Sequence, residues 1–313
     1  MRKITVVTLA FSFITIIALG QQDAQFSMYM FNKLQVNPAY AGMNKTLCAT
    51  VLLRQQWVGF KDPNGVDGAP KTGLVSIDYG YISKIHGGLG LTVEQEQIGF
   101  AKVLKAKLAY SFHKRLNIGT IGFGLDAGMI QKSIKPLGKD GFISPNGGTS
   151  THGGVGTNGF DQSIPWSGST VTTYDIGLGA YYHTNRLYVG LSSLHIPGQT
   201  VNSAEKASTS PSAKDSAWKY IYTAARHYYL TAGYTFRPSP DWEITPSFLT
   251  KSVIASTQVD VNLMAKWNRT LFVGFTYRLT DAYVIMGGLE KRVSKYLTAR
   301  LGYSYDITIF DIK

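Results

Sequence analysis

The sequence is short of cysteine, of charge and of long apolar runs. Cys48 is the only cysteine among 313 residues, so the chain can form no internal disulfide bond. Charged residues make up 16% of the chain, against roughly 25% in soluble globular proteins. A mean hydropathy of −0.03 is too polar for a bundle of membrane helices, which needs several runs of about 20 apolar residues. These shortages argue against both an ordinary soluble domain and a helical membrane protein.

Glycine and aromatic residues are abundant instead. The chain has 33 glycines, and 12% of its residues are aromatic, with 19 tyrosines. Hydrophobic residues reach 44%, enough to bury a large core, so intrinsic disorder is excluded. This composition is typical of an all-β protein whose two faces meet different solvents.

The first twenty residues have the pattern of an export signal. Arg2 and Lys3 precede a long apolar run, and Ala18 and Gly20 are the small residues that a cleavage site requires. We therefore predict a secretory signal peptide over residues 1–20 rather than a membrane anchor. The chain is expected to be exported and to fold without disulfide bonds.

The remainder alternates between apolar and polar residues with a period of two, which predicts strands. Between residues 102 and 114, for example, apolar side chains fall on one face and lysine, serine and histidine on the other. We predict thirteen strands, centred near residues 52, 76, 91, 108, 123, 178, 189, 231, 247, 262, 275, 286 and 302.

Three features favour a transmembrane barrel over a soluble β-sandwich, although both alternate. The polar face is rich in glycine, serine and threonine, and the strands are long enough to cross a bilayer when tilted. Aromatic residues recur near the ends of the apolar stripes, as interfacial girdles do: Trp57, Tyr79, Tyr81, Tyr110, Phe112, Tyr182, Phe236, Trp267, Tyr303 and Tyr305. The fold expected for residues 44–313 is therefore an antiparallel β-barrel of the outer membrane.

The connections between the predicted strands differ in length according to whether they follow an even-numbered or an odd-numbered strand. Those after even-numbered strands are short, whereas those after odd-numbered strands include the long segments 61–68, 133–172 and 197–220. Tight periplasmic turns and long outer loops are how bacterial barrels are built, with an even number of strands. Most short turns carry Lys, Arg or His, so much of the net charge of +12 is expected at the periplasmic rim and not on a nucleic-acid-binding surface.

No constellation of residues indicates an enzyme, a cofactor or a metal. Gly154, Gly156 and Gly159 match a dinucleotide-binding pattern, but no helix is predicted after them. The six histidines have no metal-ligand spacing. Glu94 and Glu96 share a strand face as an acid–base pair would, yet we expect them to form charge pairs with Lys105 and Lys107 across the lumen wall.

The segment over residues 21–43 differs from the strands. It does not alternate, but it contains Phe26, Met28, Tyr29, Met30 and Phe31, which need burial. We predict a short plug that packs inside the barrel or against its periplasmic mouth.

Four blocks of residues, at 25–32, 37–42, 54–60 and 68–72, resemble the PorP/SprF family, outer-membrane proteins of the type IX secretion system in Bacteroidetes. Two positions depart from the family pattern. Lys33 stands where the family has proline, and the family's usual last strand beyond Asp306 is absent, so the closure of the barrel stays an open question. The residues that carry the resemblance are Gln25, Phe26, Ser27, Tyr29, Phe31, Asn32, Asn37, Pro38, Ala39, Tyr40, Gly42, Arg54, Gln55, Gln56, Trp57, Gly59, Phe60, Ala69, Pro70, Lys71 and Thr72.

The resemblance implies a barrel of about fourteen strands and a non-enzymatic role in protein export. Its expected partners are outer-membrane lipid, the components of the translocon, and large exported adhesins, including those of gliding motility, that carry a C-terminal targeting domain. Two other classes stay open at this point. One is a channel for small or hydrophobic solutes, and the other is a secreted soluble β-protein.

Overall fold

The computed structural model describes residues 23–59, 69–82, 86–99, 101–134, 169–205, 218–253 and 256–309. The predicted signal peptide and the glycine pattern at residues 154–159 lie outside the described residues.

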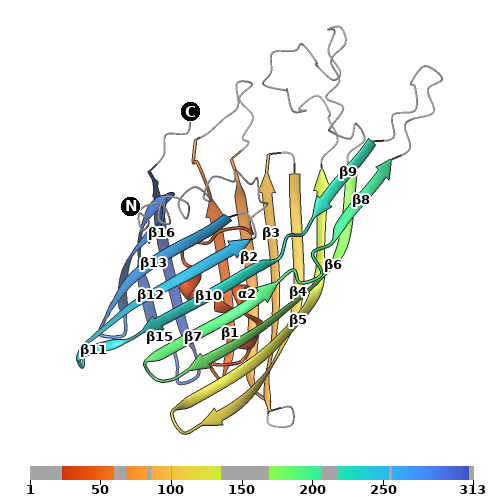
Figure 1. The fold of residues 1–313 in the computed structure, drawn as a ribbon. Coiled ribbons are helices and arrows are strands. Elements are labelled where there is room, and N and C mark those ends of the chain that lie inside the picture. The colour runs from red at the N-terminus through yellow and green to blue at the C-terminus, as the bar shows by residue number, and fades with distance from the viewer. Residues whose placement is uncertain are drawn as a thin grey trace, which may run out of the picture.

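One antiparallel sheet dominates the described part of the chain (Figure 1). It contains fourteen strands, thirteen of them in a continuous path, and β11 extends it beside β12. The path consists of β1 (Leu47–Gln55), β2 (Lys71–Ile82), β3 (Gly87–Ile98), β4 (Ala101–Leu116), β5 (Gly119–Ile134), β6 (Ser169–His183), β7 (Leu187–Leu194), β10 (His227–Tyr234), β12 (Trp242–Val253), β13 (Ser256–Trp267), β14 (Leu271–Arg278), β15 (Ala282–Arg292) and β16 (Thr298–Thr308). Each of the thirteen predicted centres falls in one of these strands, so the all-β barrel prediction is confirmed.

The expected loop over residues 197–220 is in part wrong. Two further strands, β8 (Thr200–Glu205) and β9 (Trp218–Thr223), pair with each other in a separate two-stranded sheet that projects from one end of the barrel (Figure 1). β11 (Phe236–Ser239) was also not predicted. These segments are only four to six residues long, too short for a clear period-two signal.

The two faces of the sheet have the expected partition. On β4, Lys105, Lys107 and Ser111 are buried towards the lumen, whereas Leu108 and Phe112 are exposed on the outside. The predicted girdle residues Trp57, Tyr79, Tyr110, Phe236, Trp267, Tyr303 and Tyr305 are likewise exposed. The apolar side chains therefore form the outer surface of the barrel, as a lipid-facing wall requires.

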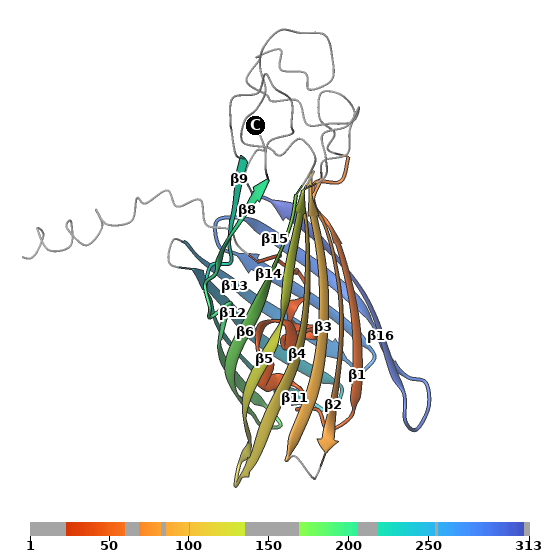
Figure 2. The same ribbon diagram turned by 90° about the vertical axis from the view of Figure 1, so that its right-hand side faces the viewer.

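Three short helices lie inside the barrel: η1 (Tyr29–Phe31), α2 (Lys33–Val36) and η2 (Pro38–Tyr40). Figures 1 and 2 both show α2 enclosed by the strands. The described helices include none that is both long enough and apolar enough to cross a membrane.

The two ends of the barrel differ. The turn end holds the tight connections, such as 117–118, 184–186 and 268–270. At the opposite end, here the loop end, β5 finishes and β6 begins, and the β8–β9 hairpin projects from the same end (Figure 2).

The first and last strands of the path, β1 and β16, are not joined by a backbone ladder in the described residues. Thirteen successive antiparallel strands place β1 and β16 in the same direction, both running from the turn end to the loop end. The barrel therefore has a seam between two parallel edge strands.

Candidate functional site

The N-terminal segment from Asp23 to Met43, here the plug, fits the lumen because the wall opposite it is built from glycine. A Cβ atom on Gly80 would lie 1.9 Å from the carbonyl oxygen of Gly42, and one on Gly124 would lie 2.2 Å from the backbone nitrogen of Ala39. Both contacts are with plug backbone, so a larger residue at either position would displace the plug.

Hydrogen bonds fix the plug to strands on several sides of the lumen. The Asn37 amide donates to the carbonyl oxygens of Ala180 on β6, at 3.0 Å, and Leu191 on β7, at 3.3 Å. Ser111 on β4 donates to the carbonyl of Ala39 at 2.8 Å. Ser76 on β2 donates to the side-chain oxygen of Asn32 at 3.0 Å. The backbone of the plug is thus satisfied by side chains of the wall, and wall backbone by side chains of the plug.

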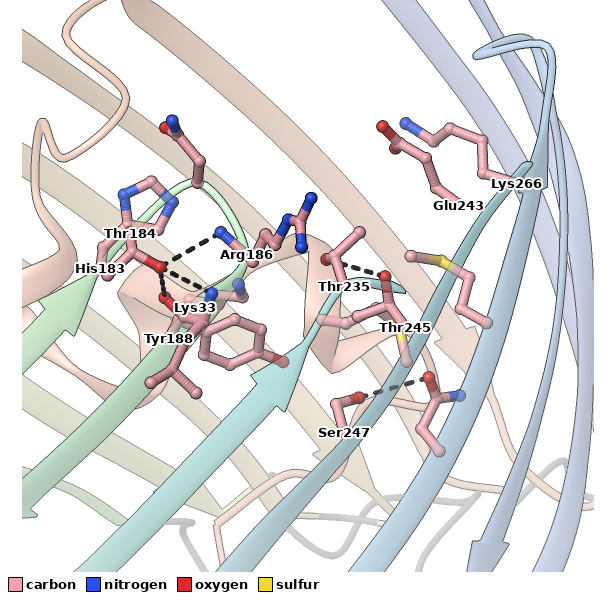
Figure 3. A pocket seen from close by; sticks show the side chains of 15 residues that line it. Lys33, His183, Thr184, Arg186, Tyr188, Thr235, Glu243, Thr245, Ser247 and Lys266 are labelled. Atoms are coloured by element: carbon pink, nitrogen blue, oxygen red, sulfur yellow. Dashed lines mark hydrogen bonds between the residues drawn. The ribbon is translucent and has the colours of Figure 1, made fainter. Parts of the chain in front are cut away.

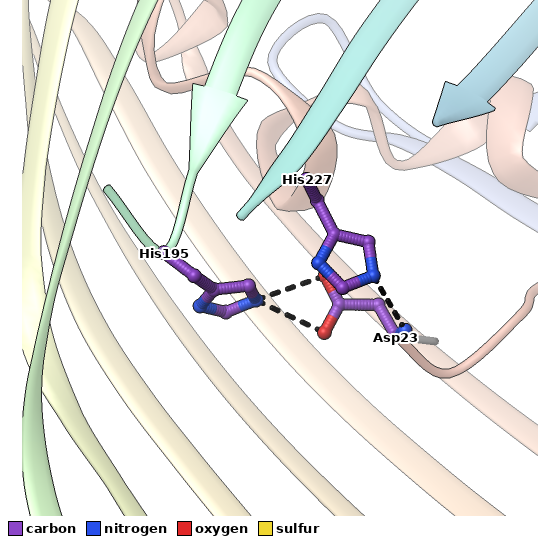
Figure 4. A group of neighbouring side chains, drawn as sticks. All are labelled: Asp23, His195 and His227. Atoms are coloured by element: carbon purple, nitrogen blue, oxygen red, sulfur yellow. Dashed lines mark hydrogen bonds and ion pairs between the residues drawn. The ribbon is translucent and has the colours of Figure 1, made fainter. Parts of the chain in front are cut away.

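The strongest attachment is at Asp23 (Figure 4). Its carboxylate lies 2.5 Å from the Lys105 ammonium, 2.8 Å from the Tyr229 hydroxyl and 3.0 Å from His195 Nε2. The Lys251 ammonium donates to its backbone carbonyl at 2.8 Å. We call Asp23 with Lys105, His195, His227, Tyr229 and Lys251 the anchor cluster.

His227 binds the backbone of Asp23 rather than its carboxylate. His227 Nδ1 lies 2.9 Å from the carbonyl oxygen of Ala225 and therefore donates to it. Its Nε2 is then free of hydrogen and accepts from the Asp23 backbone N–H at 3.0 Å. This arrangement requires the neutral form of His227.

The three side chains Asp23, His195 and His227 are close enough to hold a metal ion, with ligand atoms within 4.8 Å of one another. The fit is poor, however. Both His227 nitrogens form hydrogen bonds with backbone groups, and the Lys105 ammonium forms an ion pair with the Asp23 carboxylate. The cluster is therefore assigned to anchoring the plug.

Electrostatics keep the Asp23 carboxylate charged. Burial by itself would raise the pKa of Asp23, but the positive charges of His195 and Lys105 outweigh it and hold that pKa well below its usual range. His195 in turn lies between two carboxylates, since its Nδ1 is 2.9 Å from Asp175. A charged carboxylate amid charged partners binds far more strongly than a neutral one.

The predicted charge pairs across the lumen wall are confirmed for Glu94 and wrong for Glu96. Glu94 lies 3.1 Å from Lys105, its partner in the β3–β4 register. Lys107 does not face Glu96. It pairs with Asp126 on β5 at 3.2 Å, because the register places Thr92 opposite Lys107.

The remaining motif blocks meet at the loop end of the β1–β2 hairpin. Arg54 is paired with Thr72 and Gln55 with Lys71 in the register, and the Gln56 N–H donates to Pro70 at 2.9 Å. Ala69, Pro70 and Thr72 are buried, whereas Trp57 and Gly59 are exposed with positive φ. Phe60 lies outside the described residues.

Most plug residues of the motif are buried: Phe26, Ser27, Tyr29, Asn32, Asn37, Pro38, Ala39 and Gly42. Gln25, Phe31 and Tyr40 are half-buried. The motif thus falls in two places, the lumen and the loop end, and Arg54 links them through the seam.

At the seam, side chains replace the missing ladder. Arg54 on β1 contacts Asp306 on β16 at 2.8 Å, and Ser27 of the plug donates to the same carboxylate at 2.6 Å. Arg278, whose side chain is fully buried, approaches Asp306 at 3.3 Å and Asp260 at 3.3 Å. The plug and both edge strands therefore share one charged network.

A cavity of about 220 Å³ lies at the turn end, beside the plug (Figure 3). Lys33 lines it, and its ammonium is 3.4 Å from the centre of the Tyr188 ring, a cation–π contact. Burial, with a smaller contribution from Arg300, lowers the pKa of Lys33 to about 7.

The anchor cluster was not predicted from the sequence. Asp23 lies outside the family-like blocks, and His195 and His227 are 172 and 204 residues away from it. The one sequence signal for it is that His227 and Lys251 lie in segments where apolar and polar residues alternate, which places them on strands but does not show what they contact.

Comparisons with known proteins give one family. The model of the type IX secretion system membrane protein PorP/SprF matches residues 18–313. No curated protein matches the chain.

Two solved structures are similar. A mutant of the ferric enterobactin receptor PfeA from Pseudomonas aeruginosa has 10% identity and a TM-score of 0.36, over 84% of this chain and 48% of the receptor, so the chain spans about half the receptor's length. The beta domain of the Bordetella autotransporter BrkA has 11% identity and a TM-score of 0.36, over 83% and 97% of the two chains.

The family match includes every residue that the structure describes. The apolar outer wall and the plugged lumen agree with that match, because they are features of a barrel surrounded by lipid. The chain is thus an outer-membrane protein, and it belongs to the PorP/SprF family of type IX secretion system membrane proteins.

Proposed function

We propose that this protein assists the secretion or surface attachment of large adhesins, including those of gliding motility, by binding their C-terminal domain rather than by catalysis. The family supports a place in the secretion machinery. In this proposal the plugged barrel is an anchor in the membrane, and the segments at the loop end hold the exported protein.

The observation that carries the proposal is the occupied lumen. Asp23, Ser27, Asn32, Asn37 and Ala39 of the plug are bound to β12, β16, β2, β6 and β4 respectively. A plug held from all these sides leaves little reason to expect a continuous solute path. Binding at the loop end does not need such a path.

A channel for small or hydrophobic solutes is the second candidate. The observation in its favour is a cavity of about 800 Å³ at the turn end, lined by Lys45, Gly119, His183 and Tyr234 among others. It would serve a channel only if the plug moved.

The experiment combines conductance with capture. We expect the purified full chain in planar bilayers to carry little steady current. Pull-downs from cells should recover a large surface protein through its C-terminal domain, and deletion of the gene should remove that protein from the surface or the medium. Large ohmic currents from the intact chain, with no exported protein recovered, would favour the channel.

The orientation is tested separately. In a Cys48→Ser background, cysteines at positions 150 and 208, both outside the described residues, are expected to react with an impermeant label on intact cells. A cysteine at Ser239, in β11 at the turn end, should stay unlabelled. The reverse pattern would put the turn end outside and remove the proposed binding surface.

A further inference from the structure

The seam between β1 and β16 is the part of the barrel that the proposed function leaves unexplained. Outward side chains at the seam are far more exposed than those on neighbouring strands. Leu53 on β1 is 83% exposed and Tyr303 on β16 is 74% exposed. Val75 on β2 and Ile285 on β15 are 44% and 55% exposed. Among the described residues, each edge strand therefore lacks a neighbouring strand on one side.

An unpaired strand edge is costly in a bilayer. The hydrocarbon core supplies no water to satisfy backbone N–H and C=O groups, which is why strands cross membranes only in paired form. In water, such an edge is a template for another strand. Inside the barrel, the Arg54–Asp306 ion pair and Ser27 close the seam at the level of side chains, but they satisfy none of the edge backbone.

The direction of the two edges specifies what fits between them. β1 and β16 both run from the turn end to the loop end. A single strand inserted between them, running from the loop end to the turn end, would be antiparallel to both and would complete an even-numbered antiparallel barrel. The seam strands of a second copy do not qualify, because copies oriented alike in the membrane would present parallel strands.

The charged side chains at the turn end of the seam indicate which terminus of an inserted strand would lie there. Lys45 precedes β1, and Arg292, Lys295 and Arg300 flank the β15–β16 turn; all four are exposed. The acid that lies among them, Glu290, is bound to Lys266 and Arg300. A strand that descends from the loop end and finishes here would bring its C-terminal carboxylate to a basic surface.

We propose that the seam accepts the last β-strand of the exported protein, inserted from the loop end with its C-terminal carboxylate at the basic turn end. This inference rests on the proposed function, since it names the part of the C-terminal domain that is bound. The strand has about ten residues, the length that crosses a bilayer. Its outward residues are apolar, and its lumen residues are small or polar to pass over the plug.

The test uses a photo-crosslinking amino acid in the full chain, in cells. We place it at Val51 on β1 or at Tyr303 on β16, both outward-facing at the seam. Matched controls carry it at Ile77 on β2 or Ile285 on β15, which face outward but have paired neighbours on both sides. The crosslinked peptides are identified by mass spectrometry.

The expected result is that Val51 and Tyr303 crosslink to the final ten or so residues of an exported protein, at least tenfold above both controls. Removing those residues from that protein should abolish the crosslink. The variant Arg292→Glu with Lys295→Glu should reduce it several-fold, whereas Arg269→Glu, in the turn between β13 and β14, should not. Folding of each variant is checked by heat-modifiable mobility.

Four results would overturn the proposal. Crosslinks from Val51 to β16 of the same chain would mean direct parallel closure. Crosslinks to a second copy or to a translocon component would show that the seam binds a different partner. Recovery of an exported protein whose crosslinks all map to the loop end would reject the seam and leave the proposed function standing, whereas recovery of no exported protein would reject both.

Discussion

Arg54 and Asp306, 252 residues apart, form an ion pair of 2.8 Å that joins the first and last strands of the sheet. Arg54 belongs to a family-like block at the loop end, and Asp306 also binds Ser27 of the plug. One carboxylate therefore connects the motif, the plug and the seam, and its loss should affect all three.

Asp306→Ala is expected to destabilise the barrel by about 3–5 kcal/mol, because it removes the ion-pair partner of the largely buried Arg54 and leaves the buried Arg278 with one partner fewer. The measurement is urea unfolding of the protein in detergent micelles. Glu243→Ala breaks the exposed pair with Arg237 and should cost no more than about 1 kcal/mol. Equal costs for the two variants would contradict the network.

Gly80→Ala should displace the plug, since the new Cβ would lie 1.9 Å from the carbonyl oxygen of Gly42. The plug should then become sensitive to protease, and the steady conductance should rise. Gly73→Ala on the same strand is the control, because the nearest atom to its Cβ is 3.5 Å away, at the end of the Leu53 side chain. A plug that stays protected in Gly80→Ala would mean that the wall has room.

Asp23 gives the plug a defined pH dependence. Because its pKa is held well below the usual value, its contribution to docking is fully present above about pH 4 and is lost only as the pH falls through the depressed pKa. The loss of plug protection caused by removing the Asp23 charge should therefore be the same at pH 7 and pH 5. Asp23→Asn should weaken protection at both values, whereas Asp241→Asn, at an exposed position, should not. An effect of Asp23→Asn that is present at pH 7 and absent at pH 5 would contradict this assignment.

Lys33 should act in the opposite pH range. Its pKa is lowered to about 7, so at and below pH 7 the protein bears the cost of a buried charge, and stability should increase as the pH rises from 7 towards 10.5. Lys33→Met should stabilise the protein at pH 7 and remove that increase. Unfolding in urea across this range is the measurement, with Lys114→Met, at an exposed position on the turn end, as the control. The same pH profile in Lys33→Met and in the unchanged protein would contradict the lowered pKa of Lys33.

Leu125 and Leu263 face outward in the middle of their strands. Arginine at either position should cost about 2–4 kcal/mol if it lies at the bilayer midplane. Ile118→Arg, in the exposed turn between β4 and β5, should cost about 0–1 kcal/mol. Refolding into lipid vesicles measures the difference. Negligible effects at both leucines would mean that this surface does not meet lipid.

The sequence by itself determined the strands and the need for a buried plug. Strict alternation over Leu104–Phe112 allows one face to meet lipid and the other the lumen, so the strand and its orientation follow from local order. Phe26 and Tyr29 are too apolar to stay in water, and both are buried in the lumen. Such properties depend on residues close together in the chain.

Only the tertiary structure decided which side chains meet. The pairing of Lys107 with Asp126 rather than Glu96 depends on the register between strands, which alternation fixes only in its parity. Asp23 meets His195 and His227 because the barrel brings β7 and β10 around the plug. The parallel direction of the seam already follows from the odd number of predicted strands, but the Arg54–Asp306 contact across it does not. These contacts are long-range consequences of closure, and a period of two contains no information about them.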